Sequence, residues 1–387
     1  MTSIKQAIQY GRELLTNKVY NPQQEASLLL GYSINKTKEF LISHSDESIS
    51  EISFQHYQAY LSRRAKGEPI AYIQQQKEFW SLDLKVTPAV LIPRPETELI
   101  IEIALQLLQG KNHANILDLG TGSGCIALAI AKEKPDALIT ACDNSSDCID
   151  IAKINAQKHA LDNITFITSN WFQSVDTNNF DIIISNPPYI SNDDEDIEYG
   201  VQKYEPKPAL FSSRQGLEDL FHIINHAPNY LSSNGTLLVE HGYKQGNDVR
   251  TQFSKCGYNN VQTLHDIQQL ERVTQGTAAK LMDLKTDEDG FLLDPEDWDE
   301  DFALSTAKET ELELNQDHWR VIHMIRQLYS DSGVVPELRT ILKNLRQEIG
   351  KDNATRKYVY ALFPYGYGQQ GCKIAGMRKP LKLWLDL

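Results

Sequence analysis

The sequence has no long apolar run, few cysteines and no recognisable targeting segment. Its 387 residues contain no hydrophobic stretch approaching the ~20 residues that a membrane-spanning helix needs. The opening residues, Met-Thr-Ser-Ile-Lys-Gln, lack the basic start and apolar core of a signal peptide. Five cysteines form no Cys-x-x-Cys pair and give an odd count, so a disulfide scaffold is not expected. These absences predict a protein of the reducing cytoplasm with no membrane partner.

Basic residues are also in short supply. The chain has 38 Lys and Arg against 52 Asp and Glu, a formal net charge of −14. Tight binding to nucleic acid depends on basic side chains that displace counterions from phosphates, and the overall field opposes it. Direct binding to nucleic acid is therefore not expected.

Metal ligands are not grouped along the chain either. His222 and His226 are spaced for one helix face, but no third ligand is evident near them. We interpret them as surface or hydrogen-bonded core histidines, and no metal site is predicted.

The periodicity of apolar residues changes twice along the chain, which predicts three domains: 1–80, 81–282 and 283–387. The first domain reads as wholly helical. Its opening helix places these residues on one face: Ile4, Ala7, Ile8, Gly11, Leu14 and Leu15. Asn21 is expected to cap a second helix that has Pro22 at its first position. A third helix is expected over 51–66.

The second domain alternates between predicted strands and helices. Strands are expected at 115–119, 138–142, 164–168, 181–185, 236–240 and 261–265. Helices are expected at 95–109, 124–132, 145–160, 217–230 and 244–255. This order is typical of an α/β fold with a mostly parallel, doubly wound sheet.

A boundary at about 280–285 precedes an acidic stretch, since residues 287–301 hold nine acids and no base. Helical periodicity then returns without further strands. Asn315 is expected to cap one helix that ends at Gly333, and Pro336 to open the next.

A glycine loop follows the first strand of the predicted sheet. Residues 118–124 read Asp-Leu-Gly-Thr-Gly-Ser-Gly, and Asp143 ends the next strand, where an acid can accept hydrogen bonds from ribose hydroxyls. The dinucleotide fingerprint fails because position 125 is Cys, and a phosphate loop fails for want of Gly-Lys-Ser/Thr. A plain turn remains an alternative. The loop resembles motif I of class I S-adenosylmethionine-dependent methyltransferases.

The tetrad Asn186-Pro187-Pro188-Tyr189 follows the strand expected at 181–185. Asn-Pro-Pro alone is a good turn, but here it ends a strand of the sheet that carries the glycine loop, so both open into one crevice. The Asn186 side chain and the Pro187 carbonyl can each accept one N–H of an –NH2 group, and Tyr189 can pack on the planar target. Such a nitrogen needs orientation towards the methyl donor rather than a strong base.

Enzymes that methylate adenine in DNA and enzymes that methylate glutamine in protein share this tetrad. The flanking sequence distinguishes them at 67–72 (Gly-Glu-Pro-Ile-Ala-Tyr), 78–80 (Glu-Phe-Trp), 92–98 (Ile-Pro-Arg-Pro-Glu-Thr-Glu), 170–172 (Asn-Trp-Phe), 240–242 (Glu-His-Gly) and 271–274 (Glu-Arg-Val-Thr). With these segments, about residues 1–276 resemble the HemK/PrmC family of release-factor glutamine methyltransferases.

The resemblance implies a cofactor, a substrate and their contacts. The residues implied for S-adenosylmethionine are Gly120, Thr121, Gly122, Ser123, Gly124, Asp143, Trp171 and Asn186. Those implied for the glutamine amide are Asn186, Pro187, Pro188 and Tyr189, with Arg94 and Glu96 in a loop over the site. Asn170 stands where the family has aspartate. The implied partner is a class 1 peptide-chain release factor, methylated at its Gly-Gly-Gln motif and held partly by the helical N-terminal domain.

Residues 284–387 resemble the DsrC/TusE family of sulfur-relay proteins, notably at 287–292, 317–319, 362–364 and 371–380. That family carries sulfur on a cysteine eleven residues beyond the position of Cys372. Here that position is Leu383, so the usual sulfur carrier is expected to be absent. Cys372, if exposed beside Lys373, would be a reactive candidate sulfur site with possible sulfur-relay partners. The alternative is an inert Cys372 in a binding or regulatory module.

Three other interpretations stay open from the sequence. The first is a DNA adenine methyltransferase, which the acidic charge and the missing target-recognition domain oppose. The second is a non-catalytic adaptor, which the intact motifs oppose. The third is DNA binding by helices around Gly333 and Pro336, which the lack of a basic recognition helix opposes.

Overall fold

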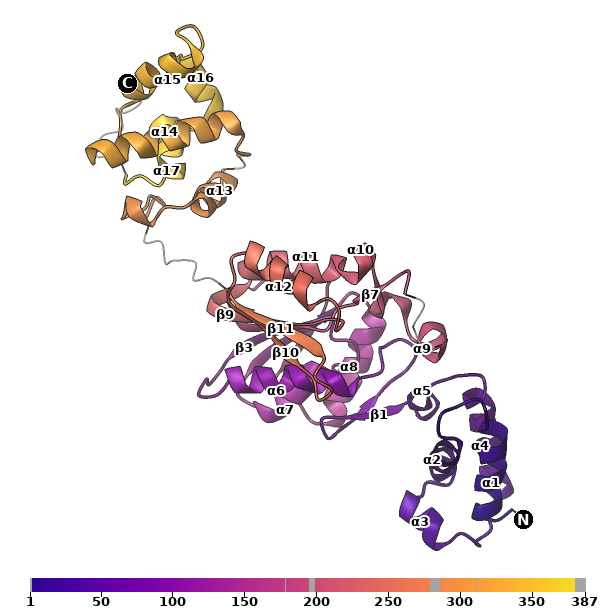
Figure 1. Cartoon of the computed structure of the whole chain (residues 1–387). Coiled ribbons are helices and arrows are strands. Elements are labelled where there is room, and N and C mark those ends of the chain that lie inside the picture. Colours follow the sequence, from indigo (N-terminus) through magenta and orange to yellow (C-terminus); the bar gives the residue numbers. More distant parts are fainter. Residues whose placement is uncertain (1, 178, 195–198, 279–285, 311, 380–387) are drawn as a thin grey trace. The chain divides into compact units, whose positions relative to one another are not determined.

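The computed structural model describes residues 2–177, 179–194, 199–278, 286–310 and 312–379. The chain divides into two compact units, Met1–Ala279 and Lys280–Leu387. Figure 1 labels many of their helices and strands. Within the described ranges, no helix is long and apolar enough to cross a membrane.

The first unit begins with a small helical bundle. Its helices are α1 (Ile4–Leu15), α2 (Pro22–Ile34), α3 (Lys38–Ser43), α4 (Glu51–Arg64) and α5 (Ile70–Gln74). The expected face of α1 is confirmed, because Ile4, Ala7, Gly11 and Leu15 are buried against α2 and α4. Asn21 stands at the N-cap position of α2 and Pro22 is its first residue, which confirms both predicted positions. The side chain of Asn21 makes no capping bond and instead donates to Gln24 Oε1 over 3.1 Å.

The first 80 residues are not wholly helical. Strands β1 (Gln76–Phe79) and β2 (Leu82–Lys85) form an antiparallel hairpin. Its two turn residues, Trp80 and Ser81, have φ of 52° and 53°, a conformation that hairpin turns usually assign to Asn or Gly. Because neither residue type is present, the sequence pattern did not indicate this turn.

A seven-stranded sheet in the described residues forms the core of the first unit. Across the sheet the order is β10 (Asn259–His265), β11 (Glu271–Thr277), β9 (Leu231–Glu240), β6 (Phe180–Ser185), β3 (Asn115–Leu119), β4 (Leu138–Asp143) and β5 (Ile164–Thr168). From β9 to β5 every pairing is parallel, which confirms the predicted doubly wound sheet. Strand β11 was not predicted. It enters antiparallel between β9 and β10.

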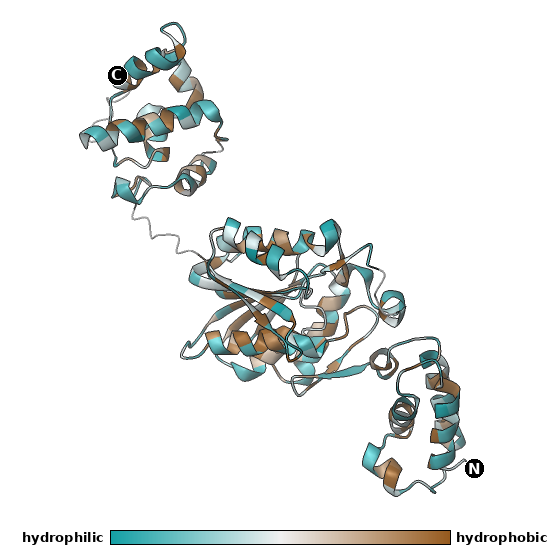
Figure 2. Ribbon diagram, viewed as in Figure 1, coloured by the Kyte–Doolittle hydropathy of each residue, from teal (hydrophilic) through white to brown (hydrophobic). Residues whose placement is uncertain are grey.

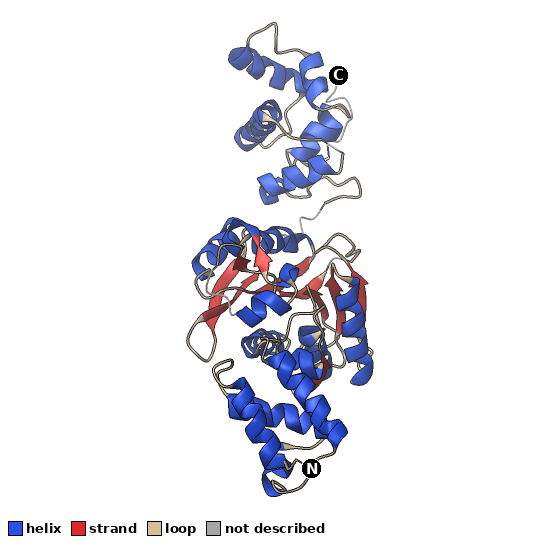
Figure 3. Ribbon diagram, turned by 90° about the vertical axis from the view of Figure 1, so that its right-hand side faces the viewer, coloured by secondary structure: helices blue, strands red, loops and turns tan. Residues whose placement is uncertain are grey.

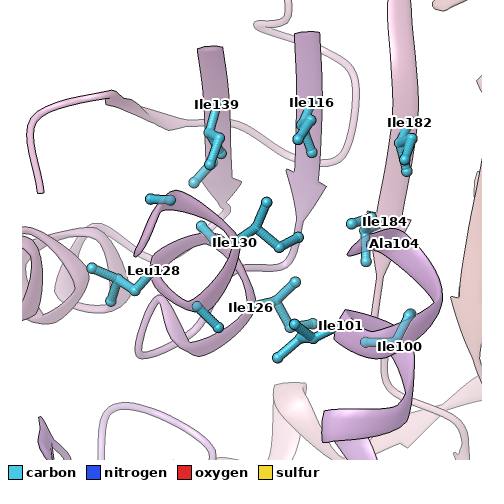
Figure 4. Close-up of a cluster of buried hydrophobic side chains, with 14 of the residues drawn as sticks. Ile100, Ile101, Ala104, Ile116, Ile126, Leu128, Ile130, Ile139, Ile182 and Ile184 are labelled. Atoms are coloured by element: carbon cyan, nitrogen blue, oxygen red, sulfur yellow. The ribbon is translucent and has the colours of Figure 1, made fainter. Parts of the chain in front are cut away.

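Helices cover both faces of the sheet (Figure 3). Helices α6 (Glu98–Leu107), α7 (Cys125–Glu133) and α8 (Ser146–Lys158) contribute to the apolar cluster on one face, and Figure 4 shows strand residues such as Ile116 and Ile139 facing α6 and α7. Helices α11 (Glu218–His226) and α12 (Gly246–Lys255) pack on the other face, against Leu117 and its neighbours. Successive residues of β3, such as Ile116 and Leu117, are therefore buried in different apolar clusters on the two faces of the sheet. Side chains that alternate between the two faces of a strand produce this arrangement.

Short elements make up the rest of the first unit. They are η1 (Pro95–Thr97), β7 (Ile190–Ser191), α9 (Tyr199–Tyr204), η2 (Lys207–Ala209), β8 (Phe211–Ser212), α10 (Ser213–Gly216) and η3 (Ala227–Asn229). The chain from β7 to α10 lies directly after the Asn-Pro-Pro-Tyr tetrad, and β7 pairs in parallel with β8. This insertion supplies one wall of the cavity described below.

The second unit is helical in its described residues. Its elements are η4 (Pro295–Asp297), α13 (Glu300–Lys308), α14 (Gln316–Ser332), α15 (Leu338–Ile349), α16 (Arg356–Leu362), η5 (Tyr367–Gly371) and α17 (Cys372–Ile374). The expected ends of α14 are confirmed: the side chain of Asn315 accepts from the backbone of Asp317 and His318, and Gly333 ends the helix at φ 66°. Its helices carry hydrophobic and hydrophilic residues together (Figure 2), as helices with one buried face do.

Candidate active site

The glycine loop leaves β3 in a conformation that suits glycine. Gly120, Gly122 and Gly124 have φ of 75°, 55° and 85°. A Cβ on Gly124 would lie 2.7 Å from the side chain of Leu128 and 3.1 Å from Cβ of Ala152. The loop can therefore turn tightly into α7 only with glycine at this position.

Asp143 connects this loop to the end of β4. Its Oδ2 accepts from the backbone N of Gly122 at 2.9 Å, and its Oδ1 accepts from the backbone N of Ser145 at 3.0 Å. Each carboxylate oxygen has a second lone pair, so the group can still accept from a ligand hydroxyl. The sequence predicted Asp143 but did not indicate its bonds to the loop.

Asp118 lies beneath the loop and is fully buried. Burial raises the pKa of its carboxyl to about 7, although a hydrogen bond from the Thr121 hydroxyl, 2.6 Å from Oδ2, opposes the shift. Its Oδ1 has no hydrogen-bond partner among the described residues. Thr121 and Ser123 are also buried, so they support the loop from within.

A cavity of about 190 Å³ opens beside the loop. It is lined by Ala89, Leu91, Gly120, Gly122, Asp143, Asn144, Ser145, Cys148, Ser169, Asn170, Trp171, Asn186, Pro188, Pro206, Pro208 and Ala209. Six predicted site residues thus meet at one cavity: Gly120, Gly122, Asp143, Trp171, Asn186 and Pro188. The predicted residues that do not line it are Thr121, Ser123, Gly124, Pro187, Tyr189, Arg94 and Glu96. The sequence did not indicate the lining residues within 89–91 and 206–209, because no local motif includes them.

Trp171 has a strained backbone next to the cavity. Its φ is 49°, which is uncommon for a bulky residue and is a feature of functional sites. The indole Nε1 donates to Asp219 Oδ1 over 3.2 Å, and a Cβ on Gly120 would lie 3.5 Å from the indole ring. Asp219 of α11 therefore helps to hold Trp171 over the glycine loop.

The tetrad is held by residues from distant segments. Asn186 donates from Nδ2 to Oγ1 of Thr97 at 3.1 Å, and the Tyr189 hydroxyl donates to Oε1 of Glu240 at 3.2 Å. Burial raises the pKa of the Glu240 carboxyl to about 7, while hydrogen bonding from Thr97 and Tyr189 and the charge of Arg272 oppose this shift. Burial also raises the pKa of Tyr189 above its usual range.

Arg94 is engaged in an ion pair with a buried carboxylate. Its Nη2 lies 2.6 Å from Oε1 of Glu205, whose Oε2 accepts from the backbone N of Ile92 at 3.1 Å. The pair ties the 92–94 loop to the segment after the tetrad. Glu205 carries no sequence signal beyond its acidic type, and it was not predicted.

Comparison with known proteins follows the same division of the chain. Residues 6–74 match the family model of the PrmC N-terminal domain, 98–202 the methyltransferase small domain, and 279–383 the DsrC like protein. The release factor glutamine methyltransferase of Aliivibrio fischeri is 42% identical over 257 residues, which are 66% of this chain and 90% of that protein. The enzyme of the same name from Coxiella burnetii is 41% identical over 273 residues, 70% of this chain and 98% of that protein.

This chain belongs to the release factor glutamine methyltransferase family. It is a class I methyltransferase that uses S-adenosylmethionine, with a helical N-terminal region and a DsrC-like C-terminal domain. Among solved structures, the oxidized gamma-subunit of the dissimilatory sulfite reductase (DsrC) from Archaeoglobus fulgidus is 38% identical, with a TM-score of 0.24, over 26% of this chain and 90% of that chain. A release factor-specific protein-(glutamine-N5) methyltransferase from Alicyclobacillus acidocaldarius is 26% identical, with a TM-score of 0.32, over 51% of this chain and 99% of that chain.

The expected exposure of Cys372 in the DsrC-like domain is wrong. Its side chain is 0% exposed and belongs to the apolar core of the second unit. Trp298 Nε1 donates to the Ile374 carbonyl at 2.8 Å, and Arg326 donates to the Ala375 carbonyl at 3.1 Å. Side chains from other parts of this domain therefore hold the backbone that follows Cys372. Lys373, expected to activate the thiol, pairs instead with Glu309 at 3.4 Å. The prediction about Leu383 lies outside the described residues.

Proposed function

We propose that this protein transfers a methyl group from S-adenosylmethionine to the side-chain amide nitrogen of the glutamine in the Gly-Gly-Gln motif of class 1 peptide-chain release factors. The observation that carries the proposal is the position of Asn186. Asn186 lines the cavity that Gly120, Gly122 and Asp143 also line, and its Nδ2 donates a hydrogen bond to Thr97 Oγ1. The names of the relatives, which match over nine-tenths or more of their own length, support the same substrate.

The cofactor would occupy the cavity beside the glycine loop. Backbone atoms of Gly120 and Gly122 can approach it closely, since neither residue has a side chain. Asp143 would accept from the ribose hydroxyls with the lone pairs that its two backbone donors leave free. Trp171 and Asn170 would contact the adenine from the opposite wall. When bound, S-adenosylmethionine supplies an electrophilic methyl group on a cationic sulfur.

The tetrad would hold the methyl acceptor. Asn186 Oδ1 and the Pro187 carbonyl would each accept one N–H of the glutamine amide, which directs the nitrogen at the methyl group. Pro188 lines the cavity beside Asn186, and Tyr189 would pack on the planar amide. The amide proton becomes acidic only as the C–N bond forms. Catalysis is therefore chiefly orientation and approach, and no strong base is required.

Adenine in DNA is the competing substrate for this tetrad. A match to the PrmC N-terminal domain over residues 6–74, instead of a DNA-reading domain, favours a protein substrate. The net charge of −14 also opposes contact with a polyanion.

The three segments would divide the work. Residues 1–80 would hold the release factor, 81–282 would bind cofactor and transfer the methyl group, and 283–387 would act as a non-catalytic binding or regulatory module. The burial of Cys372 favours that last assignment over sulfur transfer, because an attacking thiolate needs access to its partner.

The test is incubation of the full chain with labelled S-adenosylmethionine and a purified class 1 release factor, followed by peptide mass mapping. We expect one methyl group on the glutamine of the Gly-Gly-Gln peptide. A release factor with that glutamine changed to asparagine is the control and should stay unlabelled. Label on duplex DNA, with none on the release factor, would refute the proposal.

A further inference from the structure

One side chain, that of Gln245, joins the two ends of the insertion from β7 to α10. Gln245 lies directly before α12. Its Nε2 donates to the carbonyl of Tyr189, where the insertion begins, over 3.0 Å and to the carbonyl of Gln215, near its end, over 3.2 Å. Its Oε1 accepts from the backbone N of Gly242 at 2.8 Å. Backbone groups have fixed donor and acceptor roles, so these three bonds determine the orientation of the Gln245 amide.

The Tyr189 carbonyl is the last polar group of the tetrad backbone. Because the rings of the two prolines fix their φ, fewer free torsions separate this carbonyl from Asn186 than in an ordinary segment. At the other end of the tetrad, the hydroxyl of Ser185 in β6 donates to the Leu119 carbonyl of β3 at 2.8 Å. The tetrad is therefore a short, stiff segment that is held at its start by β3 and at its end by Gln245.

The segment after β9 holds Tyr189 at a second point. The Tyr189 hydroxyl donates to Oε1 of Glu240 at 3.2 Å, and Gly242, two residues later, supplies the N–H that orients Gln245. The Glu-His-Gly segment at 240–242 thus supports the tetrad both directly and through Gln245.

Gly216 brings the end of the insertion against the same carbonyl. Its φ is 82°, and a Cβ on it would lie 2.0 Å from the Tyr189 oxygen and 2.8 Å from Nε2 of Gln245. Only glycine allows this approach. Since β7 and β8 pair over only two residues each, the contacts at the Tyr189 carbonyl are a large part of what closes the base of the insertion.

We propose that Gln245 is a positioning residue for methyl transfer, because it joins the tetrad to the insertion whose residues 206–209 contribute to the cavity wall. The inference rests on the proposed function. Without Nε2 of Gln245, the carbonyls of Tyr189 and Gln215 lose their shared donor, and the tetrad and the wall can move apart. The amide nitrogen of the substrate would then meet the methyl group less often in a productive geometry, which slows the chemical step.

The test compares four variants of the full chain: Gln245→Met, Gln245→Glu, Gly216→Ala and the double variant Gln245→Met/Gly216→Ala. Methionine keeps the length of the glutamine side chain without its amide. Ionised glutamate keeps the acceptor for Gly242 but has no donor for Tyr189. Alanine at position 216 places a methyl group against the Tyr189 carbonyl.

Two controls match these changes. Gln157→Glu makes the same chemical change at an exposed position on α8. Gly257→Ala adds a methyl group where φ is 74° but where a Cβ meets no atom within 4 Å, so it separates the strain of a positive φ from contact with Tyr189. Measurements are kcat and KM for release-factor methylation, calorimetric affinity for S-adenosylhomocysteine, and thermal unfolding.

We expect each single variant at positions 245 and 216 to lower kcat roughly 10–100-fold, a loss typical of misplaced reactants. KM for the release factor and the affinity for S-adenosylhomocysteine should stay within about three-fold of wild type, because the loss falls on the chemical step. The double variant should lose no more than the worse single variant, since both changes break one contact. Gln245→Glu retains the size of the side chain, so the comparison stands even where Gly216→Ala does not fold.

Wild-type kcat in Gln245→Met and Gln245→Glu would overturn the inference, even if their unfolding temperatures fell, because Gln245 would then be structural only. Losses that multiply in the double variant would overturn it, as would equal losses in Gly216→Ala and Gly257→Ala. In each of these cases the wild-type chain still methylates the release factor, so the proposed function stands. If the wild-type chain binds S-adenosylhomocysteine but does not methylate the release factor, the proposed function is wrong and the inference falls with it.

Discussion

Asp143 at the end of β4 accepts a hydrogen bond from the backbone N of Gly122 over 2.9 Å, which ties two parallel strands together at the cavity. The same carboxylate accepts from Ser145, so it is fixed before any ligand arrives. A carboxylate held in this way loses little freedom on binding a hydroxyl pair.

Asp143→Ala should therefore weaken cofactor binding by roughly 1.5–3 kcal/mol, about 10–150-fold in Kd, the usual loss for hydrogen bonds to a charged group. Calorimetry with S-adenosylhomocysteine measures the change. Asp150→Ala, at an exposed position on α8, is the control and should bind as wild type does. An unchanged Kd for Asp143→Ala would remove this residue from the site.

Asn186→Ala removes the side-chain amide of a residue that lines the cavity. We expect the rate of release-factor methylation to fall at least ~100-fold, comparable with the loss of one oriented group in other active sites. Asn112→Ala, at an exposed loop position, should have no effect. Turnover of Asn186→Ala close to that of wild type would contradict the assigned role.

The buried carboxyl of Asp118 predicts a pH-dependent cost in stability. Its pKa is raised from 3.8 to about 7 in the folded chain, so between these values the folded state holds a proton that the unfolded state has lost. Stability therefore falls as pH rises from about 4 to about 7. Asp118→Asn removes this titration and should be more stable than wild type at pH 8 by roughly 1–3 kcal/mol, the cost of an unsatisfied buried group.

Urea unfolding of both proteins without cofactor, from pH 4 to pH 8, measures this difference. The advantage of Asp118→Asn should shrink towards zero near pH 4, where the wild-type carboxyl is protonated in both states. The exposed Asp150→Asn should show no such trend. A difference that does not change with pH would mean that the carboxyl is ionised in the fold throughout this range.

Burial of Cys372 predicts slow thiol chemistry. Under native conditions a persulfide donor or iodoacetamide should modify the half-buried Cys256 before Cys372, and all five cysteines should react together in urea. Peptide mass mapping over time measures the order. Rapid persulfidation of the wild-type chain that disappears in Cys372→Ser would show that this thiol carries sulfur.

The local sequence pattern was sufficient to predict most strands of the sheet and the site residues that belong to a contiguous motif. Strands β3 and β5 begin and end at the residues predicted for them, 115–119 and 164–168. Four of the five residues of β3 are buried, as expected for a central strand of a parallel sheet. Strand β11 was missed because only Val273 among its residues is aliphatic, and its two antiparallel pairings are long-range. The composition of these seven residues does not distinguish a strand from a loop.

The same distinction separates the predicted site residues from those that were missed. The glycine loop and the tetrad are contiguous, so spacing alone indicates them. Thr97, Glu205 and Glu240 act on residues 51 to 113 positions away, and a single sequence carries no record of such pairs. The prediction that Cys372 is exposed was wrong for a related reason: Lys373 follows it in the sequence, but its neighbours in space form an apolar cluster.

Removal of residues 284–387 should leave methyl transfer nearly unchanged. The first unit is compact by itself, and relatives that match only this part of the chain bear the name of the complete enzyme. The measurement is kcat/KM on a release factor for a chain ending at residue 283. Ile341→Asp in the full chain is the matched control, since a charge in the buried core of the second unit should unfold that unit alone. Both proteins should keep kcat/KM within about three-fold of wild type, because every predicted methyltransferase residue belongs to the first unit. A truncated chain that folds and binds S-adenosylhomocysteine but cannot methylate would show that the DsrC-like domain takes part in the reaction.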